Sequence, residues 1–85
     1  MGSLRIDGVR FFAYLEDHEP CHLHAFYAQT EAIVELRRES RQVALAARRD
    51  AVRPGGARRS DVKHILQVAA EDFDVLCKLW EDAHD

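Results

Sequence analysis

The sequence predicts an α+β fold, with a small antiparallel sheet of three or four strands followed by one or two C-terminal helices packed on one face. Short stretches of alternating apolar residues occupy about positions 8–48, and apolar residues at helical spacing occupy about 60–83. A loop at about 50–57, containing Pro54-Gly55-Gly56, separates the two parts. Strands followed by helices are typical of α+β domains. At 85 residues, the chain is expected to form a single domain, residues 1–85.

The first half contains three clear strand patterns and one weaker pattern. Residues 9–16 alternate partially and are rich in aromatic side chains, which strands favour. After a turn favoured by Asp17 and Pro20, residues 22–28 predict a second strand. Residues 31–37 predict a third, close enough to pair with the second as an antiparallel hairpin. Residues 43–47 predict a fourth strand, although their alanines suit a helix equally well.

The last third of the chain has the periodicity of amphipathic helices. Ser60 is expected to cap the first helix, with Asp61 complementing the helix dipole in its first turn. Asp72 could cap a second helical segment. The sequence leaves open whether the chain bends near Asp72 or continues as one helix. The apolar stripes of the two segments are Val62, Ile65, Leu66 and Ala69, then Phe73, Leu76, Cys77 and Trp80.

The composition is that of an ordinary globular protein, with 47% hydrophobic and 32% charged residues. No apolar run approaches the roughly 18 residues of a membrane span, so no membrane association is expected. The N-terminal residues lack the apolar core of a secretion signal. We therefore expect a cytoplasmic protein in which Cys21 and Cys77 are reduced thiols.

Charge is segregated along the chain, although the net charge is only −3. Residues 37–63 carry nine basic side chains against three acidic ones, whereas residues 64–85 carry one lysine against six acidic side chains. A basic middle next to an acidic end indicates a phosphate-binding stripe or a surface for an acidic protein partner. A solvated face whose charges pair with the acidic ends explains the pattern equally well.

The residues best suited to chemistry lie in the stretch Asp17-His18-Glu19-Pro20-Cys21-His22-Leu23-His24. Side chains alternate between the faces of a strand, so His22 and His24 should point the same way, roughly 7 Å apart along the chain. His18, in the preceding turn, could fold back towards them. Histidines at this spacing make the stretch the candidate functional site.

The histidine stretch also carries a family resemblance. Together with the aromatic strand Phe11–Tyr14 and a late helix leading to Trp80, it is similar to the bacterial domain-of-unknown-function family 4160, whose signature is DHxPPHFHA. Cys21 replaces a proline and Leu23 a phenylalanine of that signature. The resemblance implies no established activity. It implies a gene that often lies beside another small gene, in a layout suggestive of toxin–antitoxin pairs, and it favours Asp17, His18, His22 and His24 as site residues.

Three interpretations of the histidines remain open. As a metal site, His18, His22 and His24 could bind Zn²⁺, Ni²⁺ or Fe²⁺, with Asp17, Glu19 or water completing the shell. As a metal-free site, two histidines could act as general base and general acid on a phosphodiester. Arginines would then steady the phosphate, the candidates being Arg37, Arg38 and Arg41. As a structural corner, the histidines would only bond to backbone or carboxylate groups.

Three functional hypotheses follow, and they leave open whether the protein is an enzyme. The first is an interaction protein in a two-gene toxin–antitoxin-like module, bound to the small protein encoded by the neighbouring gene. The second is a histidine-dependent ribonuclease-like toxin, with or without metal. The third is plain RNA or DNA binding through residues 37–63. A small core also favours self-association as a homodimer.

Overall fold

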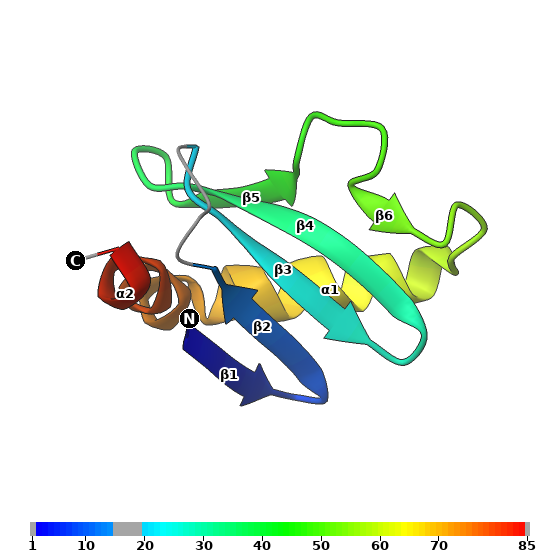
Figure 1. Ribbon diagram of the computed structural model, residues 1–85, viewed down its shortest axis with the longest axis horizontal. Coiled ribbons are helices and arrows are strands. Elements are labelled where there is room, and N and C mark those ends of the chain that lie inside the picture. The colour runs from blue at the N-terminus through cyan, green and yellow to red at the C-terminus, as the bar shows by residue number, and fades with distance from the viewer. Residues whose placement is uncertain (1, 15–19, 85) are drawn as a thin grey trace.

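The computed structural model describes residues 2–14 and 20–84, and it has an antiparallel sheet followed by two helices (Figure 1). This confirms the predicted α+β fold, with more strands than the three or four expected. The sheet comprises β1 (Gly2–Ile6), β2 (Val9–Ala13), β3 (His22–Tyr27), β4 (Thr30–Arg37), β5 (Gln42–Leu45) and β6 (Val52–Arg53). The helices are α1 (Arg59–Glu71) and α2 (Phe73–His84).

β1 lies outside the range 8–48 in which we expected the strands. It pairs with β2 across Asp7-Gly8, whose φ angles of 48° and 82° are both positive. Such two-residue turns match the right-handed twist of the strands that they join, and Asp-Gly is one of their preferred sequences. The dipeptide between Ile6 and Val9 was therefore the sequence signal for this hairpin.

Strands β1 to β5 form a meander in which each strand pairs with the next, and β6 pairs with β4. The outer edge of β4 is shared: its residues 34–37 pair with β5 and its residues 31–32 with β6. Ala46 and Ala51 still exchange backbone hydrogen bonds with Ile33 of β4, and residues 47–50 leave the sheet between them. The loop expected at 50–57 thus contains a two-residue strand, which no periodicity in the sequence could indicate.

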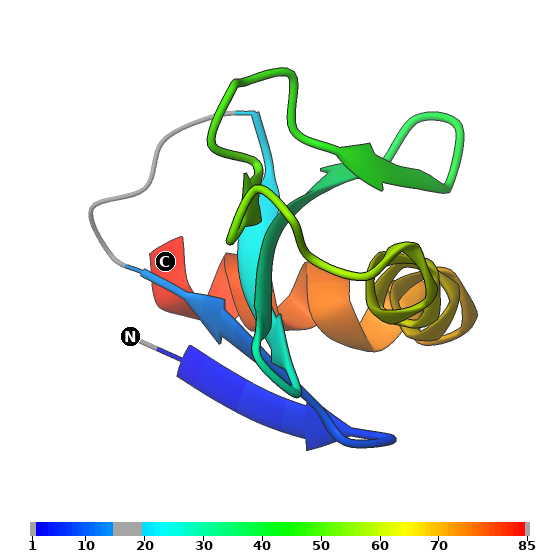
Figure 2. The same cartoon turned by 90° about the vertical axis from the view of Figure 1, so that its right-hand side faces the viewer.

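One face of the sheet is covered by the helices and carries the core. Figure 2 shows the sheet curving around α1, with α2 crossing behind the strands. The side chains of Phe11, Leu23 and Val34 on this face are 0% exposed. They pack with helix residues that include Ile65, Leu76 and Trp80. Trp80 and Phe73 of the predicted helical stripes are buried, whereas Phe26 of β3 is half-buried on the opposite face.

The helices begin and bend at defined residues. The N-cap of α1 is Arg58, without a side-chain cap, so the prediction of Ser60 as the cap was wrong. Asp61 lies in the first turn as expected, and its carboxylate accepts a hydrogen bond of 3.2 Å from the hydroxyl of Thr30. Asp72 separates α1 from α2, and its carbonyl accepts a hydrogen bond from the backbone N–H of Leu76.

Candidate functional site on the open face of the sheet

The sheet face opposite the helices carries the two described histidines of the motif. His24 lies between Phe12 and Ile33 on the neighbouring strands, and Phe26 lies between Arg10 and Glu31. Cross-strand neighbours share a face, so these side chains form one surface. We call it the histidine face, and its members are Arg10, Phe12, Tyr14, His22, His24, Phe26, Glu31, Ile33 and Glu35.

His22 and His24 share this face, as the strand alternation predicts. Their ring centroids lie 5.7 Å apart. The Nδ1 of His22 is 2.8 Å from the carbonyl oxygen of Pro20. Because a carbonyl oxygen only accepts, Nδ1 carries the proton in this contact, and the neutral ring has its acceptor lone pair on Nε2. Pro20 thus fixes both the tautomer and the orientation of His22.

His24 has a different environment. Its Nδ1 is 3.8 Å from the carboxylate of Glu31, and its side chain is only 16% exposed. This separation is too long for a hydrogen bond but close enough for an ion pair with the protonated ring. The same carboxylate lies 3.6 Å from the guanidinium of Arg53, and Tyr14 packs its ring 4.7 Å from that of His24. The two imidazoles are therefore held by chemically different partners.

The histidines belong to a continuous row of aromatic rings. The consecutive centroid distances are 5.4, 6.2, 4.7, 5.7, 5.4 and 3.8 Å along Phe26, Phe12, Tyr14, His24, His22, Trp80 and His84. The last paired residues of β2 and β3 are Phe12 and His24. Beyond this pair, the row of rings continues from the histidine face to helix α2. There the α2 residue Trp80 contacts His22. The sequence placed Trp80 correctly in the core but carried no signal for this contact.

A hollow of about 300 Å³ adjoins His22. Its wall includes Pro20, Ile33 and Glu35, together with Ala46, Ala47 and Arg48 from the excursion between β5 and β6. Arg48 is held by two hydrogen bonds of 2.7 and 3.0 Å to Asp50, which lower the pKa of that carboxyl. Arg48 carries no local sequence signal as a site residue, because only the fold brings it close to the histidines.

The arginines chosen from the sequence divide between two places. Arg37 and Arg38 line a second hollow, of about 380 Å³, which shares Pro20 and Glu35 with the first. Arg41 instead donates hydrogen bonds of 2.8 and 3.0 Å to Asp74 of α2. This contact raises the pKa of Arg41 and lowers that of Asp74. Arg37 and Arg38 therefore lie beside the histidine face, whereas Arg41 is bound to the helix layer.

The remaining motif residues, Asp17, His18 and Glu19, lie outside the described residues. Within residues 2–14 and 20–84, no group of three His, Cys, Asp or Glu side chains is placed to hold a metal ion. Neither Cys21 nor Cys77 forms a disulfide within the described residues, and burial raises the pKa of Cys77. No described helix is long and apolar enough to cross a membrane.

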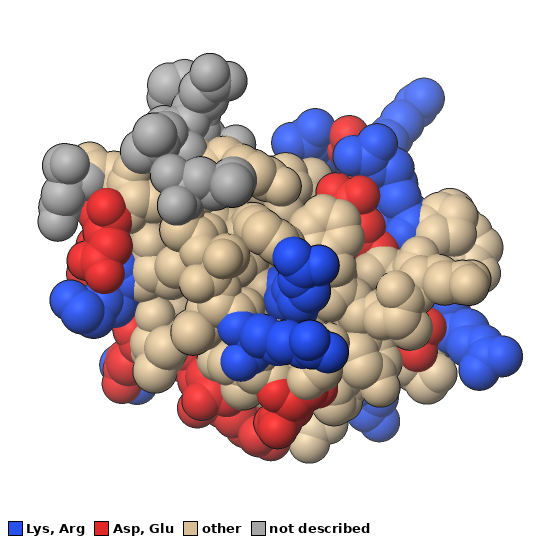
Figure 3. All heavy atoms as spheres, turned by 60° about the horizontal axis from the view of Figure 1, so that its bottom comes forward, with Lys and Arg blue, Asp and Glu red and all other residues tan. Residues whose placement is uncertain are grey.

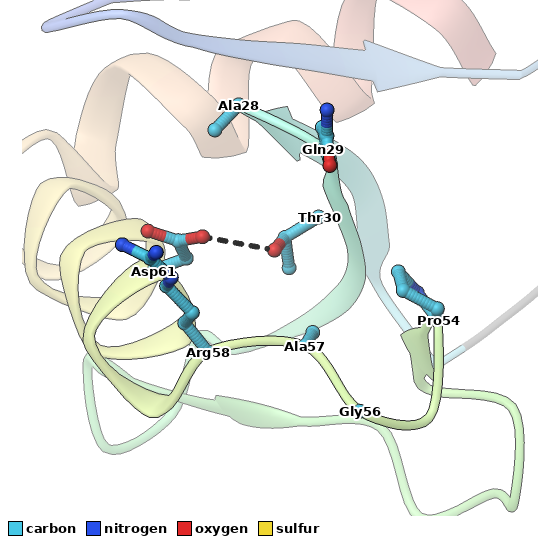
Figure 4. Close-up of a pocket in the computed structure, with 8 residues that line it drawn as sticks. All are labelled: Ala28, Gln29, Thr30, Pro54, Gly56, Ala57, Arg58 and Asp61. Atoms are coloured by element: carbon cyan, nitrogen blue, oxygen red, sulfur yellow. Dashed lines mark hydrogen bonds between the residues drawn. The ribbon is translucent and has the colours of Figure 1, made fainter.

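A further hollow, of about 520 Å³, lies at the start of α1 and contains no histidine (Figure 4). Thr30 and Asp61 face each other across it and form the hydrogen bond described above. The rest of its wall consists of Ala28, Gln29, Pro54, Gly56, Ala57 and Arg58. The Thr30–Asp61 contact joins the beginning of β4 to the first turn of α1, which is a structural role.

The fold and this face define a small α+β domain whose open sheet surface presents paired histidines among aromatic and charged side chains. Residues 8–81 match the family described as a domain of unknown function, DUF4160, and the chain belongs to that family. The resemblance noted from the histidine motif is thereby confirmed. No curated protein and no solved structure matches the chain. β1 precedes the matched residues.

Proposed function

We propose that the protein cleaves RNA through the histidine face, as the ribonuclease-like component of a two-gene toxin–antitoxin-like module. The pairing of His22 with His24 carries this proposal. Their rings lie 5.7 Å apart on an open face, one beside a backbone carbonyl and the other beside a carboxylate. Two titratable groups in different environments are the arrangement that acid–base catalysis needs.

We propose a different role for each ring, on the basis of its surroundings. The Nε2 of His22 would take the proton from a ribose 2′-hydroxyl, whose oxygen then attacks the adjacent phosphorus. As the bond from oxygen to phosphorus forms, the bond from phosphorus to the 5′-oxygen breaks, and protonated His24 would give its proton to that oxygen. The products are a 2′,3′-cyclic phosphate and a 5′-hydroxyl. The carboxylate of Glu31, 3.8 Å from the Nδ1 of His24, would face this ring during the transfer.

The rest of the face has the chemistry of a surface for single-stranded RNA. Phe12, Tyr14 and Phe26 are aromatic side chains on which unstacked bases can pack. Arg5 and Arg10 lie directly opposite each other on β1 and β2. Like charges in such cross-strand pairs are destabilising, and a bound phosphate would relieve their repulsion. Seen with the bottom of Figure 1 turned forward, the molecule has a small group of basic side chains within a broad uncharged area, and acidic side chains gather below it (Figure 3).

The test is cleavage of a fluorophore-labelled single-stranded RNA by purified protein. His22→Asn keeps a donor for the Pro20 carbonyl but lacks the acceptor nitrogen, and we expect it to reduce cleavage by about 100-fold or more. The matched control is His64→Gln, because His64 lies on α1 and contacts the carbonyl oxygen of Asp7 at 3.0 Å. Wild-type protein without cleavage activity, or full activity in His22→Asn, contradicts the proposal.

A second proposed role is binding to the small protein encoded by the neighbouring gene. The observation that favours it is uncompensated positive charge away from the histidine face. Within the described part of the chain, Arg58, Arg59 and Lys63 have no acidic partner. Co-expression of the two genes should yield a stable complex on co-purification, and its absence removes this role. Self-association as a homodimer stays a prediction, which size-exclusion chromatography tests.

A further inference from the structure

An apolar groove opens at the sheet edge, between the helix layer and the outer strands. Its volume is about 430 Å³. Leu45 at the end of β5 and Val52 of β6 form one side, and Val62 and Leu66 of α1 form the other. Leu45, Val52 and Leu66 are only partly buried against the core. Figure 2 shows how β5 and α1 flank this edge. The groove therefore exposes apolar side chains at the margin of the core.

Positive charge borders this apolar surface. Arg59 and Lys63 lie one helical turn apart on α1, and both line the groove. Neither has an acidic partner among residues 2–14 and 20–84. Other basic side chains of the same segment do have one: Arg37 pairs with Glu35, Arg41 with Asp74, Arg48 with Asp50 and Arg53 with Glu31. Part of the uncompensated charge of the described residues therefore lies where apolar surface is also exposed.

We propose that this groove binds an acidic, amphipathic segment of a partner protein. Apolar side chains of the segment would enter between Leu45 and Leu66, and its carboxylates would pair with Arg59 and Lys63. The occupant is a peptide and not RNA because the groove has an apolar lining without an aromatic side chain on which a base could stack. The outer edge of β5, which no described strand pairs, also offers backbone groups for strand addition.

This inference deepens the partner-binding role proposed above and rests on it. It does not depend on RNA cleavage, because the groove and the histidine face lie on different sides of the sheet. The two surfaces can therefore be altered separately. Charge reversal at exposed positions of α1 leaves the imidazoles untouched, and changes in the imidazoles leave the groove intact.

The experiment is an NMR titration of ¹⁵N-labelled protein with a short synthetic peptide of alternating leucine and glutamate. We expect saturable amide shifts at Leu45, Val52, Val62 and Leu66. Peptides with serine for leucine, or lysine for glutamate, should not bind. The double variant Arg59→Glu/Lys63→Glu should weaken binding by about tenfold or more. The matched control Arg5→Glu/Arg10→Glu reverses the same number of exposed charges on β1 and β2, away from the groove, and should change affinity less than about twofold.

Absence of saturable shifts, shifts confined to the histidine face, or equal weakening by both double variants overturns the inference. Saturable binding of a single-stranded RNA oligonucleotide at the four groove residues overturns it as well. Co-purification with the neighbouring gene's product tests the partner-binding role separately from the choice of the groove as its surface. If the complex forms with wild type and survives Arg59→Glu/Lys63→Glu, the groove is the wrong surface while the partner-binding role stands. If wild type forms no complex, the role itself fails.

Discussion

The two faces of strand β3 differ in what they contact and in what they can do. Leu23 and Ala25 point to the helix-covered face and are 0% exposed. His22, His24 and Phe26 alternate with them and point to the open face. A strand can serve both purposes because its side chains alternate at every residue. Neighbouring residues of β3 therefore serve different purposes. One set packs in the core, the other belongs to the candidate site, and the two sets do not occupy the same space.

The composition of each face reflects this difference. The covered face is apolar, since burial of a polar group without a partner is costly. The open face holds two histidines, two glutamates and an arginine among its aromatic rings. Several of these groups are largely covered, but each has a polar partner nearby: the Pro20 carbonyl for His22, Glu31 for His24 and Arg37 for Glu35. Substitutions on the two faces should therefore separate stability from activity.

Leu23→Ala is expected to have the largest effect on stability. It removes a fully buried side chain beneath the helices and should lower the free energy of unfolding by about 2–5 kcal/mol. The measurement is urea denaturation followed by circular dichroism. His24→Ala, one residue along the same strand, is the control and should cost about 1 kcal/mol or less. Equal losses in both variants would show that the two faces do not divide as described.

Thr30→Val tests a polar contact between the sheet and α1. Thr30 is 3% exposed, and its hydroxyl donates the 3.2 Å hydrogen bond to Asp61. Loss of a bond to a charged acceptor should lower the free energy of unfolding by about 1.5 kcal/mol in the same assay. Thr30→Ser keeps the hydroxyl and should lose less. If Thr30→Ser lowers the free energy of unfolding more than Thr30→Val does, the stabilisation comes from the methyl group of Thr30 and not from its hydroxyl.

Phe12→Leu probes the open face without touching a histidine. The rings of Phe12 and Phe26 meet edge to face at 5.4 Å. Such pairs contribute about 0.5–1.5 kcal/mol beyond their buried area, and we expect a loss near the lower end because the face is open to solvent. RNA binding, measured by fluorescence anisotropy, should weaken more clearly than stability. Unchanged RNA affinity in this variant argues against base stacking on Phe12.

Arg41→Ala should have the smallest effect, because Arg41 and Asp74 are both exposed. The contact lowers the pKa of Asp74 below its ordinary value of 3.8. A lowered carboxyl pKa contributes stability above the unfolded-state value, and this contribution is lost as pH falls through the folded-state value. The small difference between wild type and variant should therefore be present at neutral pH and vanish in acid. A difference that grows in acid contradicts this assignment.

Local periodicity was enough to predict the strands and helices whose apolar residues follow a regular spacing. The alternation in residues 22–28 and 31–37 predicted β3 and β4, and it placed His22 and His24 on one face. Helical spacing predicted α1 and α2 with Trp80 in the core. β6 could not be predicted, because a strand of two residues is defined only by its pairing with β4.

The contacts that shape the candidate site come from distant parts of the chain. Arg48 reaches the hollow beside His22 because residues 47–50 leave the sheet. Trp80 of α2 contacts His22 beyond the last β2–β3 pair, Phe12 with His24. Neither event has a signature in local sequence. The Ser60 cap failed for a related reason: α1 begins at Arg59, and its first turn is joined to β4 through Asp61.

The aromatic row gives the native protein an optical signal of its own. The chain has a single tryptophan, Trp80, whose ring lies 5.4 Å from that of His22 and 3.8 Å from that of His84. Indole fluorescence is sensitive to nearby imidazole rings and to their protonation. A ligand in the hollow beside His22 would contact the ring that packs on Trp80, so the emission of Trp80 should change when this hollow is occupied. Occupancy can then be followed without an attached dye.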